Sequence, residues 1–85
     1  MYPFDLIIHG VREIHPSQTR SGRKECEVND ANPQFFTVYQ KERETGEEQA
    51  LQDTETLSGA IHVAKDMPRG IGAHLIIPTI LLKYL

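Results

Sequence analysis

The spacing of the apolar residues changes at Thr56, and this change constrains the fold more than any other feature of the sequence. Before Thr56, apolar and polar residues alternate in short runs, which is the period of a β-strand with one buried face. After Thr56, apolar residues recur at intervals of three and four, the spacing of a helix with one buried face: Leu57, Ala60, Ile61, Ala64 and Met67. The sequence therefore predicts several strands followed by one helix over residues 56–67.

Five segments carry strand-like patterns: residues 2–14, 25–28, 34–43, 49–53 and 74–77. Gly10 predicts a bulge in the first strand, and alternation in the second predicts that Cys26 and Val28 face inward. The third segment has apolar residues on both faces, which indicates a central strand. The fourth is largely polar, which indicates a strand near an edge of the sheet.

Turn and cap residues lie where these elements should begin and end. In the sequence RETGEE, Gly46 stands where a hairpin turn needs a left-handed backbone. Thr56, or Asp53 or Thr54 just before it, can cap the helix by accepting a backbone N–H. Pro68 cannot continue the helix. The strands at residues 34–43 and 49–53 are therefore expected to form a hairpin.

Together these patterns predict an α+β fold: an antiparallel or mixed sheet of four or five strands with one main helix packed on one face. The 85 residues form a single domain, residues 1–85, with a small hydrophobic core. The formal net charge of −3 implies no particular partner.

The composition also indicates a compartment. A single cysteine, Cys26, cannot form an intramolecular disulfide, as is typical of a reducing compartment. The N-terminus lacks the pattern of a signal peptide, and the apolar run at residues 75–82 is shorter than the roughly 20 residues of a membrane span. These observations favour a cytoplasmic protein with no membrane partner.

No motif in the sequence indicates catalysis, a cofactor or a metal site. The four histidines, at positions 9, 15, 62 and 74, do not have the spacing of metal ligands with Cys26. On an inward strand face Cys26 would act as a small hydrophobic residue. The glycines of PRGIGAH lack a following helix and are typical of a turn. We therefore expect no enzyme activity, with no catalytic, metal-binding or cofactor-binding residue.

Two charged segments are candidate binding surfaces. Arg20, Arg23 and Lys24 make the loop after the first strand basic, and they could contact the phosphates of a nucleic acid. The hairpin is acidic instead, and its Glu44, Glu47 and Glu48 could face a basic protein partner. The alternative for the hairpin is that mixed charges provide solubility and protect a sheet edge.

The C-terminal residues 75–85 are strongly apolar, and their tail at residues 79–85 could form an edge strand or a helical turn. A domain with one helix has limited surface to cover so many large side chains. Either the tail supplies the core and an edge strand, or part of it closes a homodimer. For the second case we expect Ile80, Leu82 and Tyr84 at the dimer interface.

The segment CEVNDANPQFFTVYQKERETGEEQALQDTETLSGAIHVAKDM, residues 26–67, resembles small accessory proteins carried by phages, plasmids and integron cassettes. In that pattern a strand with VY, an ETG turn, an acidic strand end and a Thr-capped, alanine-rich helix follow one another. The matching residues are Val38, Tyr39, Gly46, Asp53, Thr56 and Ala60. Ser58 and Gly59 replace the usual acidic pair, and the tail after Gly72 is not part of the pattern.

The resemblance implies a mobile-element origin, and some proteins of this kind are anti-CRISPR or other anti-defence inhibitors. Its motifs are structural, so it implies no functional residue. We therefore expect a non-enzymatic, homodimeric protein-interaction module, and a candidate inhibitor of a host defence system. The alternative is a nucleic-acid-binding accessory protein that uses the basic loop.

Overall fold

The expected change from strands to a helix at Thr56 is present in the computed structural model, which describes residues 4–14, 25–67 and 74–85. The elements follow in the order β1 (Phe4–Ile14), β2 (Glu25–Val28), β3 (Phe35–Glu42), β4 (Glu48–Thr54), α1 (Leu57–Asp66), β5 (Leu75–Ile76) and the 3-10 helix η3 (Thr79–Tyr84). The α+β class is thus confirmed, with one main helix packed against a five-stranded sheet.

The sheet has the order β2-β1-β3-β4 with antiparallel neighbours, and β5 pairs with β1 in parallel. One edge of β1 pairs with β3 from Phe4 to Val11. The other edge is shared, because β5 pairs at Leu6 and Ile7 and β2 pairs from Val11 onward. The prediction that the third strand is central and the fourth lies at an edge is therefore confirmed.

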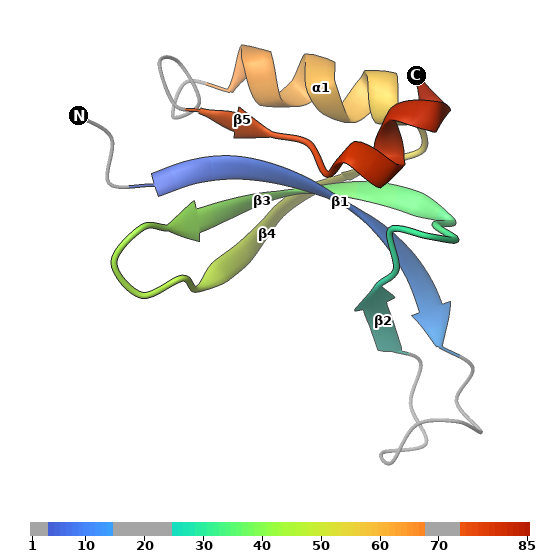
Figure 1. Ribbon diagram of the computed structural model, residues 1–85, viewed down its shortest axis with the longest axis horizontal. Helices are drawn as coiled ribbons and strands as arrows, with labels where there is room; N and C mark the ends of the chain where they lie inside the picture. The colour runs from blue at the N-terminus through green and yellow to red at the C-terminus, as the bar shows by residue number, and fades with distance from the viewer. Residues whose placement is uncertain (1–3, 15–24, 68–73) are drawn as a thin grey trace.

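One side of the sheet carries the hydrophobic core. Figure 1 shows α1 and η3 on the same side of the sheet. The buried cluster on this side contains side chains from β1, β3, α1 and η3: Leu6, Ile8, Phe36, Val38, Leu57, Ala60, Ala64 and Leu81. Leu81 is fully buried, so the apolar tail supplies part of the core, and its end forms a helical turn rather than an edge strand.

The glycine expected in the hairpin turn and a side-chain cap at the start of the helix are both present. Gly46 has a φ of 75°, the left-handed conformation that glycine adopts without steric cost. Its amide donates to the Glu42 carbonyl at 2.9 Å and closes the turn. At the start of α1, the Thr56 hydroxyl accepts a hydrogen bond of 3.0 Å from the Gly59 amide, which is the contact of an N-cap.

Two expectations about the first strands are wrong. Cys26 and Val28 do not face the core; both are exposed, because β2 lies at the sheet edge and these residues point to the side away from α1. Gly10 is not bulged; it pairs in register with Phe36. A Cβ at position 10 would lie 2.6 Å from the Pro33 Cβ, so glycine allows the β2–β3 connection to pack closely on β1.

The irregularity in the sheet lies instead between β3 and β4. Val38 pairs with Gln52 and Tyr39 with Ala50, so Leu51 is an additional residue in β4. The extra residue lets Leu51 pack against the core although its strand is mostly polar and exposed.

Of the helices that the structure describes, none has the length and apolar character needed to span a membrane.

Candidate functional site

Among the described residues, a group of mutually bonded polar side chains lies on the face of the sheet away from α1. Side chains alternate along a strand, so the residues between the core positions point to this side. We call it the open face and define it by Ile7, His9 and Val11 of β1, Cys26 and Val28 of β2, Phe35, Thr37 and Tyr39 of β3, and Asp53 of β4. Among the described elements, neither α1 nor η3 covers it (Figure 1).

His9 is the centre of a polar cluster on the open face. Its Nδ1 lies 3.3 Å from Asp30 Oδ2, and its Nε2 lies 2.9 Å from Glu48 Oε1. A neutral imidazole has only one N–H, so both contacts are hydrogen bonds to ionised carboxylates only when the ring is protonated. Both ring nitrogens therefore lie within hydrogen-bonding distance of a carboxylate oxygen.

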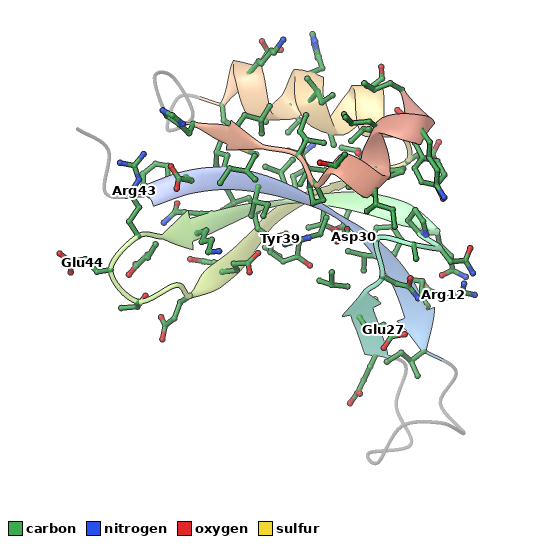
Figure 2. The ribbon with its side chains drawn as sticks, in the orientation of Figure 1. Arg12, Glu27, Asp30, Tyr39, Arg43 and Glu44 are labelled. Atoms are coloured by element: carbon green, nitrogen blue, oxygen red, sulfur yellow. The ribbon has the colours of Figure 1, made fainter. Side chains whose placement is uncertain are left out.

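The neighbours of His9 are held in place by further contacts. Tyr39 packs edge-on against the imidazole, with 5.4 Å between ring centroids, and Figure 2 shows Tyr39 and Asp30 on the side of the sheet away from α1. Asp30 Oδ1 accepts a 2.7 Å hydrogen bond from the Gly10 amide. The β2–β3 connection is thereby fixed onto β1, and the carboxylate of Asp30 is oriented toward His9.

A shallow hollow of about 320 Å³ lies on the open face next to this cluster. Its lining comes from four strands and the residue after β4: Glu13, Cys26, Phe35, Asp53, Thr54 and Glu55. The Thr37 hydroxyl, from a buried side chain, donates a 2.7 Å hydrogen bond to Asp53 Oδ1 and fixes that carboxylate at the hollow. We call this feature the open-face hollow.

The titration of Tyr39 reflects the environment of the open face. Burial raises the pKa of the Tyr39 phenol, and the negative charges of Asp53 and Glu48 raise it further, with a smaller effect from Cys26. A phenolate here would be partly desolvated and would lie near carboxylates. The neutral form of Tyr39 is therefore favoured.

Of the three glutamates expected to bind a partner, Glu44 and Glu47 share the hairpin turn, whereas Glu48 bonds to His9. Glu44 lies at the tip of the β3–β4 hairpin, at the opposite end of the sheet from β2 (Figure 2), and Glu47 is exposed in the same turn. Glu48 belongs to β4 and bonds to His9 on the open face. Partner binding by these three side chains stays a prediction.

The hairpin is tied to the first strand by an ion pair. The Arg43 guanidinium donates to Asp5 Oδ1 from Nη2 at 2.7 Å and from Nε at 3.1 Å. The hydrogen bond from Arg43 lowers the pKa of the Asp5 carboxyl below its ordinary value. This contact limits the positive charge that Arg43 can offer to a partner.

The three expected interface residues of the tail all lie on η3 and all are exposed. Ile80 and Leu82 leave nearly half of their surfaces accessible, and Tyr84 is partly exposed while its ring packs edge-on against Phe36. A 3-10 helix has three residues per turn, so Leu81 and Tyr84 share the side that faces the core. Leu82 and Leu85 share a second side, and Ile80 with Lys83 form the third.

Other predicted sites are not brought together in the described structure. Arg20, Arg23 and Lys24 lie outside the described residues, as does His15, so nucleic-acid binding stays a prediction. His62 is exposed on α1 and pairs with Asp66 at 3.0 Å, which is a local contact within the helix. Within residues 4–14, 25–67 and 74–85, no group of three His, Cys, Asp or Glu side chains could hold a metal ion.

Sequence reasoning missed the cluster around His9. Its carboxylate partners lie 21 and 39 positions away along the chain. Alternation alone could place His9 on the face opposite Leu6 and Ile8, but no local signal gives the strand register that brings Asp30 and Glu48 to the ring.

No family model, curated protein or solved structure matches this chain.

Proposed function

We propose that this protein is a non-enzymatic interaction module that associates with a second copy of itself through η3. One observation carries the proposal: of the six large hydrophobic residues exposed in the described structure, five lie within residues 76–85. We call four of them the tail surface: Ile80, Leu82, Tyr84 and Leu85. Exposed apolar residues concentrated in one short segment of the chain are typical of an interaction site.

The size of the tail surface supports a weak dimer. Burying the exposed half of a large apolar side chain contributes about 1 kcal/mol. Tyr84 packs on Phe36 and is counted out, so a two-fold dimer that buries Ile80, Leu82 and Leu85 once per copy gains about 6 kcal/mol. Association itself costs about 4 to 15 kcal/mol. The two quantities are comparable, so we expect a dimer that dissociates on dilution.

The solution mass as a function of concentration, measured by light scattering or sedimentation, tests this proposal. We expect the wild type to approach the dimer mass at high concentration and Leu82→Asp to remain monomeric. Val28→Asp is the matched control, because Val28 is 50% exposed and Leu82 46%, but Val28 lies on β2. A monomeric wild type, or a dimer that survives in Leu82→Asp and is lost in Val28→Asp, would contradict the proposal.

The resemblance to accessory proteins of mobile elements suggests that a host protein is a further partner and that binding inhibits a host defence system. The exposed Glu44 and Glu47 of the hairpin are candidate contacts for such a partner, because neither forms an ion pair among the described residues. Glu44→Gln with Glu47→Gln separates this hairpin surface from the open face.

A further inference from the structure

The lining of the open-face hollow combines one aromatic side chain with three acidic ones. Phe35 is partly exposed in it, and its carboxylates come from Glu13, Asp53 and Glu55. Asp53 accepts its only hydrogen bond among the described residues from Thr37, through Oδ1, so Oδ2 faces no donor there. Glu55 is exposed and has no hydrogen bond or ion pair within the described part of the chain. Two carboxylates at the hollow are therefore available to an external cation.

No basic side chain of the described residues lines the hollow. Arg12 alternates to the other side of β1, and its guanidinium lies 3.4 Å from the Asn32 carbonyl. Arg43 is bonded to Asp5. The backbone of Lys41 is in register with Asp5 and Glu48, near the hairpin end of the sheet. The carboxylates of Asp53 and Glu55 are thus not paired with a basic side chain of the described residues.

We propose that the open face binds a basic segment of a partner polypeptide, with one arginine or lysine side chain entering the open-face hollow. The methylene stem of such a side chain packs against Phe35, because long basic side chains bury their stems on apolar surface. Its cationic end reaches Asp53 and Glu55 and forms charge-assisted hydrogen bonds. The aromatic ring adds a cation–π contribution.

The shape of the site favours a polypeptide over a metal ion or a small amine. No three ligands converge in the described residues as a metal ion requires. The hollow is shallow, so it covers only one side of an occupant and gives a free cation few contacts. Beside the hollow, the open face continues over β2, where Val28 is exposed and can contact neighbouring residues of a bound polypeptide. The partner therefore gains contacts from its backbone and neighbouring residues as well as from one cation.

This surface does not depend on the proposed dimer. The tail surface lies on the α1 side of the sheet, and the open face lies on the opposite side (Figure 1). The two interactions can therefore form in the same molecule, and a variant of one should leave the other unchanged.

A titration followed by amide NMR tests the proposal on the full chain. The probe is a capped peptide of alternating glycine and arginine, at low salt, and a glycine–glutamate peptide of equal length is the negative probe. We expect saturable shifts at Phe35, Cys26 and Asp53, and no such shifts with the acidic peptide. Absence of saturable binding, or shifts confined to the hairpin, would overturn the proposal.

Charge-matched variants locate the contact. Asp53→Asn with Glu55→Gln should weaken peptide binding about tenfold or more, because both carboxylates are lost. Glu44→Gln with Glu47→Gln removes the same charge from the hairpin and should leave the affinity unchanged. The reverse result would assign binding to the hairpin, and equal weakening in both would show that only net charge matters; either result contradicts a site in the hollow.

Two further variants distinguish loss of peptide binding from loss of folding and from loss of the dimer. Glu55→Gln alone removes no hydrogen bond or ion pair of the described residues, so the variant should fold normally. It should still weaken binding of the peptide measurably. Leu82→Asp should bind the peptide as the wild type does, so failure of the dimer and failure of the open-face site are distinguishable. If argininamide binds as tightly as the peptide, the hollow is a small-cation site and the polypeptide proposal is wrong.

Discussion

At the scale of single residues, His9 and Tyr39 show how the open face is stabilised without a covering layer. Ile7 and Val11 are buried on this face although no described helix packs on it. The rings of His9 and Tyr39 pack against each other, and His9 is fixed between Asp30 and Glu48. Partly polar side chains therefore shield the apolar ones from water on this side of the sheet.

The raised pKa of Tyr39 gives a prediction with a definite sign. The unfolded phenol ionises at its ordinary pKa, near 10, and the folded one only at higher pH. The native state then binds more protons, so the free energy of unfolding should fall as pH rises above about 10. Asp53→Asn should lower the pKa of Tyr39 toward its ordinary value, as measured by NMR titration of the ring resonances.

Glu47→Gln is the control for this titration, because Glu47 is not among the groups that perturb Tyr39. It should leave the pKa of Tyr39 unchanged. If the two variants move the pKa of Tyr39 equally, the effect comes from net charge rather than from the carboxylate of Asp53.

At the scale of elements, α1 is short, so its ends contribute a large share of its stability. It has ten residues and no acidic side chain in its first turn to interact with the helix dipole. Among the described contacts, the hydroxyl of Thr56 caps the start of the helix. The hydroxyl of Thr54 in turn donates a 2.9 Å hydrogen bond to the Thr56 carbonyl. This chain of contacts joins the end of β4 to the start of α1.

Thr56→Ala should lower the free energy of unfolding by about 1 kcal/mol, because the Gly59 amide loses its acceptor. Thr56→Ser keeps the hydroxyl and should recover most of that loss. Urea unfolding of the three proteins measures the difference. A serine variant as unstable as the alanine variant would assign the effect to the lost methyl group and not to the cap.

At the scale of the whole molecule, the tail connects the core with the surface. Leu81 is fully buried among residues of β1, β3 and α1, whereas its neighbour Leu82 is nearly half exposed. The tail therefore completes the core of one molecule and also presents apolar surface to another. The two roles belong to adjacent side chains, so single substitutions can separate them.

Leu81→Ala should lower the free energy of unfolding by about 2 to 5 kcal/mol, because it leaves a cavity in a small core. Leu82→Ala, measured at a concentration where the protein is monomeric, should change it by no more than about 0.5 kcal/mol. Denaturant unfolding of both variants provides the comparison. Similar losses in both would mean that η3 does not hold Leu81 in the core as described.

The sequence by itself determined those features that depend on neighbouring residues. The change of period at Thr56 predicted the strands and the helix, Gly46 predicted the left-handed turn, and Thr56 was one of three predicted candidates for the cap. Each follows from the conformational preference or reach of one side chain over a few positions. The fold class could be inferred because these local signals agree with one another.

Only the tertiary structure decided which strand faces are covered and which distant side chains meet. Alternation in β2 is the same whether its apolar residues face a core or water, so the exposure of Cys26 and Val28 depends on where α1 lies. Likewise the register of β1 against β3 and β4 brings His9 to Glu48. The physical reason is that coverage and register are set by contacts between elements, which no local pattern contains.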